Sequence, residues 1–184
     1  MEQQAAAKNS AEALADLTVL DTAGRTVRLG DLWRKQPVAL FFVRHFGCMF
    51  CREQVGQLRE LAPQFAARGV QLAVVGNGSV ADAAEFAGEL ALSFPLYTDP
   101  RLGTYRAAGL KRSLGSIFNF GVVKNAWRAR RGGHRQGRVR GDAWQQGGAF
   151  LIAPGNRIVF EQRSETGGDH ADPRDLLAAA SSAG

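Results

Sequence analysis

Two cysteines, the only ones in the chain, stand three residues apart as Cys48 and Cys51. An unbroken apolar run over residues 38–43 precedes them, and apolar residues at helical spacing follow them. The pair is therefore expected where a buried strand passes into a helix. The N-terminal end of a helix offers unsatisfied N–H groups and a partial positive charge, and both favour a thiolate over a thiol. This placement predicts a redox pair, with Cys48 as the attacking thiolate and Cys51 as the resolving thiol.

Two other interpretations of the cysteine pair stay open. Buried cysteines can serve simply as small apolar residues. A tetrahedral zinc site needs four ligands, and His45, His134 and His170 supply no matching second pair, so neither a metal site nor a cofactor is predicted. A zinc site shared between two proteins is the remaining form of this alternative.

The length and composition predict one domain with a sizeable core. Residues 1–16 are Ala-rich and polar and are expected to form a flexible N-terminal arm, with a single domain over residues 17–184. The arm has no signal-peptide pattern, and no stretch approaches the ~18 apolar residues of a membrane span. We therefore expect a cytoplasmic protein without membrane contact.

The net charge of +6 comes from one segment. Residues 101–141 hold 11 of the 23 basic residues and none of the 17 acidic ones. The segment could be a rim that attracts an anionic substrate, a nucleic-acid surface, or a solvated loop with incidental charge. Nucleic acid is not expected as a partner, because no paired aromatic platform accompanies the charge.

The order of the predicted elements describes an α/β fold. The expected elements are a hairpin over residues 17–29, a strand at 38–43, a helix from the cysteines to 68, a strand at 70–76, a helix at 80–90, a strand at 94–97, a helix at 100–108, a hairpin over 148–161 and a helix at 173–180. Within the strand at 94–97, Pro95 marks either a sheet edge or the start of the strand. Gly24 is expected to supply the positive φ of the first hairpin turn, Gly69 to follow the end of the long helix, and Ser79 to cap the helix at 80–90. The two buried strands flanking the long helix should form a parallel pair. A further helix is expected at 114–127. This order predicts a central mixed sheet with helices on both faces, and a basic helix or loop insertion near residues 111–147.

The stretch Phe42–Glu53, F-V-R-H-F-G-C-M-F-C-R-E, resembles the peroxiredoxin-like branch of the alkyl hydroperoxide reductase/thiol-specific antioxidant (AhpC/TSA) superfamily. Residues 141–150 and 168–170 add to the resemblance, which covers about residues 16–180. It implies a thioredoxin-like fold and thiol redox chemistry, with Cys48 at the position of the peroxidatic cysteine.

The chain departs from the usual peroxiredoxin pattern at three positions. Typical members carry Pro-x-x-x-Thr/Ser-x-x-Cys, and here the Pro position is Phe41 and the Thr position is His45. Their active-site Arg precedes a later strand, and that position reads Gly147 here. The usual set of groups that holds a peroxide is therefore not visible in this sequence.

The predicted function is that of a thiol-dependent oxidoreductase that reduces a disulfide or peroxide substrate through a Cys48–Cys51 disulfide. An external thioredoxin- or glutathione-like thiol would then reduce that disulfide. His45 is a candidate catalytic residue that would favour the thiolate when protonated, or else a packed or solvated histidine. The Arg44 side chain is expected to point away from the active-site cleft, since neighbouring residues in a strand alternate between its two faces. The candidate substrate-binding residues are Phe46, Gly47, Arg52 and Gln146, and the alternative for Arg52 is a solvated helix residue.

Two alternative functions stay open. One is a specialised reductase or biosynthetic enzyme acting on an organic peroxide-like small molecule. The other is a non-enzymatic binding module that uses the basic segment. A homodimer is also an open alternative, with apolar residues of the insertion at its interface.

Overall fold

The computed structural model describes residues 11–112, 140–165 and 170–182. The predicted helix at 114–127 and most of the predicted basic insertion lie outside these residues, as does the Gly168-Asp169 part of the family motif. Among the described helices, none is long and apolar enough to cross a bilayer.

A seven-stranded mixed sheet forms the centre of the molecule, with the order β2-β1-β5-β4-β3-β6-β7. Its strands are β1 (Thr18–Asp21), β2 (Thr26–Arg28), β3 (Val38–Phe42), β4 (Gln71–Gly76), β5 (Leu96–Thr98), β6 (Gly148–Ala153) and β7 (Arg157–Arg163). β3, β4 and β5 are parallel, and β1 and β6 run antiparallel to their neighbours in this group. The predicted mixed sheet and its parallel central pair are confirmed.

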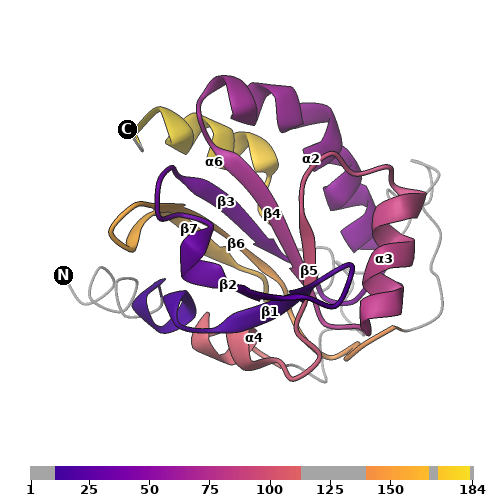
Figure 1. Ribbon diagram of the computed structural model, residues 1–184. Coiled ribbons are helices and arrows are strands. Elements are labelled where there is room, and N and C mark those ends of the chain that lie inside the picture. Colours follow the sequence, from indigo (N-terminus) through magenta and orange to yellow (C-terminus); the bar gives the residue numbers. More distant parts are fainter. Residues whose placement is uncertain (1–10, 113–139, 166–169, 183–184) are drawn as a thin grey trace.

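Helices cover both faces of the sheet (Figure 1). They are α2 (Met49–Ala67), α3 (Val80–Glu89), α4 (Gly103–Ala107) and α6 (Pro173–Ala179), with short 3₁₀ turns η1 (Leu29–Asp31) and η3 (Ala180–Ser182). Alternate residues of β3 divide between two cores. Phe41 packs under α2, α3 and α6, whereas Phe42 packs with Tyr105 of α4 on the other face.

The folded part of the chain begins before the end of the arm predicted for residues 1–16. Residues 11–15 are helical, and Ala11 and Leu14 are fully buried in the same core as Phe42. The folded part of the chain therefore starts no later than Ala11. Of the predicted arm over residues 1–16, residues 1–10 lie outside the described ranges.

Several local signals in the sequence are confirmed. Gly24 has a φ of 79° in the first hairpin turn, and Gly69 has a φ of 68° just after α2. Ser79 caps α3 in a reciprocal capping box with Asp82. Pro95 directly precedes β5, which lies between β1 and β4, so this proline marks a strand start and not a sheet edge.

The C-terminal end of β4 is shaped by two glycines that make room for one aromatic ring. A Cβ on Gly76 would lie 2.3 Å from the ring of Phe46, and a Cβ on Gly78 would lie 2.6 Å from it. The same ring contacts Phe86 of α3, with 5.3 Å between centroids. The loop that leads from β3 to the cysteines is therefore anchored between β4 and α3.

We predict that Gly76→Ala destabilises the protein by about 1–3 kcal/mol, because the added methyl group overpacks a buried site. Gly88→Ala is the matched control, since Gly88 is an exposed residue of α3 and nothing lies within 4 Å of its added Cβ. That variant should gain about 0.5–1 kcal/mol from helix propensity. Urea denaturation measures both, and equal effects of the two variants would contradict the packing described here.

Candidate active site

Cys48 is the N-cap residue of α2, in an extended conformation, and Cys51 lies in the first turn of the same helix. Both are free cysteines, with 2% and 4% of their surface exposed. The pKa of each thiol responds to the side chain of the other, so the two thiols lie close together. The predicted strand–helix junction and the closeness of the pair are both confirmed.

The environment separates the acidities of the two thiols. The pKa of Cys48 is lowered to about 7, chiefly by the hydrogen bond from Cys51, with further help from the charge of Arg44 and from the main-chain N–H groups of Cys51 and Phe50. Burial opposes this shift. The pKa of Cys51 is raised by its own burial and by the neighbouring Cys48. Near neutral pH the negative charge therefore rests on Cys48.

Arg44 directs its side chain toward the segment that precedes β6. Its guanidinium donates to the carbonyl oxygens of Ala143 at 2.8 Å and Gln145 at 3.4 Å. Its main-chain N–H lies 3.3 Å from the Cys51 sulfur, to which it donates. The expectation that Arg44 points away from the site is therefore corrected. Its carbonyl partners lie about a hundred residues further along the chain, where no local sequence signal reveals them.

Asn77 joins the cysteine loop to the segment 140–147. Its side-chain amide donates to the Arg44 carbonyl, and its Oδ1 accepts from the main-chain N–H of Asp142 at 2.7 Å. Gly141 permits this close approach, since it has a φ of 109° and any Cβ would meet Asn77. Phe46 also donates to the Arg140 carbonyl at 3.2 Å. Sequence reasoning missed Asn77, although its place directly after a buried parallel strand is a usual site for functional polar residues.

Tyr105 of α4 fixes the end of β3 from the other face of the sheet. Its hydroxyl donates to the Val43 carbonyl at 2.6 Å and lies 3.1 Å from the Val75 carbonyl. Complete burial raises the pKa of Tyr105 well above its ordinary value, so the hydroxyl stays a donor. The ring packs edge-on against Phe42, with 5.1 Å between centroids.

His45 is buried and serves as an acceptor. Its Nδ1 accepts from the main-chain N–H of Gly47 at 3.2 Å, and its carbonyl accepts from the main-chain N–H of Cys48 at 3.1 Å. Burial, together with the nearby charge of Arg44, lowers the pKa of His45 to about 4. The ring is therefore neutral at pH 7, which favours the packed histidine of the two alternatives for His45. The residue shapes the turn that presents Cys48.

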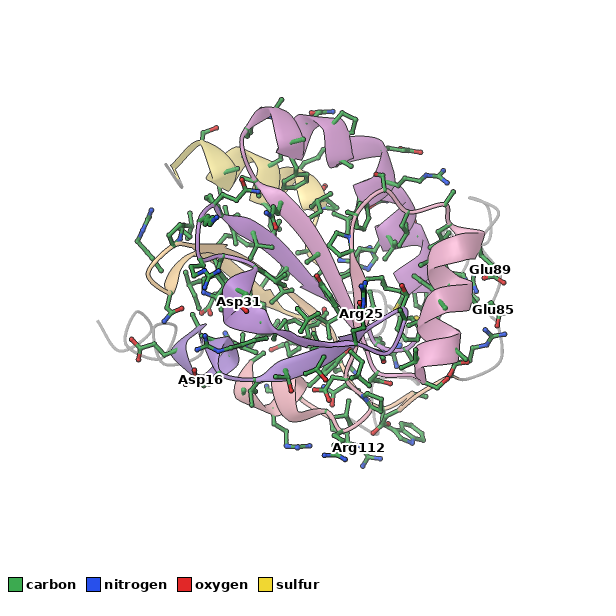
Figure 2. All side chains as sticks on the ribbon, in the orientation of Figure 1. Asp16, Arg25, Asp31, Glu85, Glu89 and Arg112 are labelled. Atoms are coloured by element: carbon green, nitrogen blue, oxygen red, sulfur yellow. The ribbon has the colours of Figure 1, made fainter. Side chains whose placement is uncertain are left out.

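The remaining predicted site residues lie around the cysteine loop. Phe46 is fully buried against α3, and Arg52 forms an ion pair with Glu89 at 2.6 Å and lies over the ring of Phe86. Figure 2 shows Glu89 on the outer side of α3, so Arg52 is directed there. Gln146 is fully buried, and its side-chain amide donates to the Trp144 carbonyl at 3.2 Å. Gly47 takes part through the bond to His45 already described.

The position of the usual peroxiredoxin arginine is sterically closed here. A Cβ on Gly147 would lie 2.3 Å from the main-chain oxygen of Phe42, so the backbone of β3 occupies the space that a side chain needs. Within the described ranges, no group of three or more His, Cys, Asp or Glu side chains is arranged to hold a metal ion.

A family model described as AhpC/TSA antioxidant enzyme matches residues 57–166. The chain belongs to the AhpC/TSA family. A peroxiredoxin-like 2C protein from Bos taurus is 33% identical over 179 residues, which cover 91% of this chain and 78% of that protein. A Salmo salar protein named prostamide/prostaglandin F synthase is 30% identical over 160 residues, or 84% of this chain and 79% of that protein.

The AhpC/TSA assignment agrees with the fold. The crystal structure of the peroxidoxin BcpB from Mycobacterium tuberculosis superposes with a TM-score of 0.69 at 22% identity, covering 92% of this chain and 94% of that one. The predicted thioredoxin-like fold is thereby confirmed. The matched range of the AhpC/TSA model begins after Cys51, so the roles of the two cysteines are argued from their geometry.

We predict that Cys51→Ala slows alkylation of Cys48 by iodoacetamide roughly five- to tenfold at pH 7, because it removes the hydrogen bond that most lowers the pKa of Cys48. Cys51→Ser is the matched control, since its hydroxyl can still donate, and it should stay nearer the wild-type rate. Peptide mass mapping over a pH series measures both. Wild-type behaviour of Cys51→Ala would show that the thiol–thiol contact does not set the ionisation.

We predict that His45 makes the protein more stable as the pH rises from about 4 to 6.5. Its pKa is about 4 in the folded state and 6.5 in the unfolded state, so the unfolded chain binds more protons in this window. The free energy of unfolding should lose roughly 3 kcal/mol from this group as the pH falls through the window. In His45→Asn, whose Oδ1 can still accept from Gly47, the free energy of unfolding should depend less steeply on pH. Urea denaturation at several pH values compares this variant with the wild type. Equal slopes would contradict the assignment of this pH dependence to His45.

Proposed function

We propose that this protein is a thiol-dependent oxidoreductase in which Cys48 is the nucleophile and Cys51 is the resolving thiol. The observation that carries the proposal is the closeness of the two thiols at the N-terminal end of α2, with the lowered pKa on Cys48. Membership of the AhpC/TSA family and the peroxiredoxin-like relatives support thiol redox chemistry as the class of reaction.

The proposed cycle has three steps. The Cys48 thiolate attacks an oxygen of a peroxide R–O–O–H, so that the O–O bond breaks, the alcohol ROH leaves with a proton, and Cys48 becomes a sulfenic acid. The Cys51 thiol then attacks the Cys48 sulfur, forms the disulfide and releases water. An external dithiol reduces the disulfide and returns two electrons and two protons. With a disulfide substrate, the first step forms a mixed disulfide, and Cys51 releases the substrate thiol.

The neutral state of Cys51 suits the first step, in which Cys48 is the nucleophile. Its raised pKa keeps the proton on sulfur, so the thiol can donate to the Cys48 thiolate until Cys48 is oxidised. Because the two residues are one helical turn apart, resolution needs no contribution from a distant segment. The proposal includes a thioredoxin- or glutathione-like thiol as reductant and a reducing compartment such as the cytoplasm.

A second candidate function is a specialised reductase or biosynthetic enzyme that acts on an organic peroxide-like small molecule. The Salmo salar relative, by its name a synthase and not an antioxidant enzyme, favours this candidate. The closed position at Gly147 also favours it, because the site lacks the arginine of typical peroxiredoxins there. Rates with hydrogen peroxide, tert-butyl hydroperoxide, a lipid hydroperoxide and oxidised glutathione separate the two: turnover of hydrogen peroxide alone would remove the second candidate.

We predict that one equivalent of the preferred oxidant converts the reduced wild type to a monomer that has lost both thiols and about 2 Da of mass, which is the signature of an intramolecular disulfide. Cys51→Ser should stop at a sulfenic acid that dimedone traps. Cys48→Ser should lose turnover by at least about 100-fold, because the nucleophile is absent.

Thiol counting and intact mass spectrometry check these three outcomes on one time course. Cys48 and Cys51 reacting with iodoacetamide at equal rates typical of free thiols would overturn the assignment of roles. A disulfide that forms equally fast in the two serine variants, between two chains, would overturn the intramolecular mechanism.

A further inference from the structure

Arg44 contacts both the cysteine pair and the segment that precedes β6. It follows β3 by two residues and is half-buried. Its main-chain N–H binds the Cys51 sulfur at 3.3 Å, while its side chain reaches the segment before β6. Its own carbonyl accepts from the side chain of Asn77, which also holds Asp142. Backbone and side chain are therefore both fixed, by partners from three parts of the chain.

The charge of Arg44 is not cancelled by its hydrogen-bond partners. Within the described residues, its guanidinium bonds are to the neutral carbonyl oxygens of Ala143 and Gln145. The nearby carboxylate of Asp142 pairs with Arg112 at 2.6 Å. On the helix that carries the cysteines, Arg52 pairs with Glu89. A half-buried guanidinium whose partners are carbonyls keeps its positive charge available to other groups.

Two ionisable side chains respond to this charge in the directions that a fixed cation requires. The charge of Arg44 favours the thiolate of Cys48, and it disfavours the protonated form of His45 in the same loop. Tyr105 faces the loop from α4 and stays neutral, as does Cys51. The groups that surround Arg44 thus leave it as the cation that acts on the Cys48 sulfur.

We propose that Arg44 is a positioning residue of the thiol chemistry, whose carbonyl-anchored guanidinium holds a fixed positive charge for the Cys48 thiolate while its main-chain N–H holds the Cys51 sulfur. The inference rests on the proposed roles of the two cysteines. Typical peroxiredoxins carry an arginine at the position of Gly147, where this chain has no room for a side chain. Arg44 supplies a positive charge to the site from the end of β3 instead.

The test is the pH dependence of Cys48 alkylation in the full-length reduced protein, with the modified cysteine identified by peptide mass mapping. Arg44→Gln should raise the midpoint of the profile above the wild-type value of about 7 and lower the rate at pH 7 about fivefold. Arg44→Lys, which keeps the charge but not the planar fork, should recover much of the lost rate.

Arg112→Gln is the matched control. Arg112 lies at the surface and anchors the same segment through Asp142, but it does not act on Cys48 (Figure 2). Its profile should follow the wild type. An equal shift in Arg112→Gln and Arg44→Gln would overturn the proposal, because it would mean that both act only by holding the segment in place.

A second readout keeps the proposal falsifiable where Arg44→Gln loosens the fold. Loosening alone would also move the alkylation midpoint up, toward the value of a free thiol, so Arg44→Lys separates the two causes. It keeps the charge and should stay near the wild-type midpoint, whereas loss of the carbonyl anchors alone would shift it as far as Arg44→Gln does. NMR titration of His45 in Arg44→Lys should give a value near that of the wild type. A downward or unchanged midpoint in Arg44→Gln refutes the proposal. Because iodoacetamide replaces the substrate, a failure to reduce peroxide would count against the proposed function and leave this test intact.

Discussion

The pairing of two thiols at the N-terminal end of α2 is the interaction on which the site depends. A buried thiolate is costly, and the chain offsets this cost with a set of donors around one sulfur atom. The Cys51 thiol is the largest contributor, and the main-chain N–H groups of α2 and the charge of Arg44 add to it. The same burial keeps Cys51 protonated, so one environment produces an ionised cysteine and its neutral partner.

The rest of the fold serves to hold that end of the helix in place. β3 is completely buried between β4 and β6, which fixes the direction in which the chain enters the cysteine loop. Tyr105 binds the last carbonyl before the loop from one face of the sheet, and Phe46 packs under α3 on the other. The segment 140–147 completes the site, because Asn77 and Arg44 tie it to the cysteine loop. Residues separated by a hundred positions thus behave as one unit.

The sequence predicted what local patterns encode. The apolar run of β3, the spacing of the cysteines and the capping residue of α3 are all contained within a few neighbouring residues, and each was predicted correctly. Arg44 was misjudged because its carbonyl partners are supplied by residues 143–145. The two alternatives for His45 stayed open for a similar reason. A histidine on a strand end gives no local sign of burial, and its neutral state follows from packing that only the folded chain creates.

The closeness of Cys48 and Cys51 along the chain has a consequence for the energetics of the redox cycle. A crosslink between them would enclose only Met49 and Phe50. Loop-closure entropy assigns such a small ring about 2 kcal/mol, under half of the value for a ring of a hundred residues. Oxidation therefore restricts the unfolded chain by less than half as much as a long-range crosslink would, so the conformational entropy that separates the two redox forms is small for a disulfide.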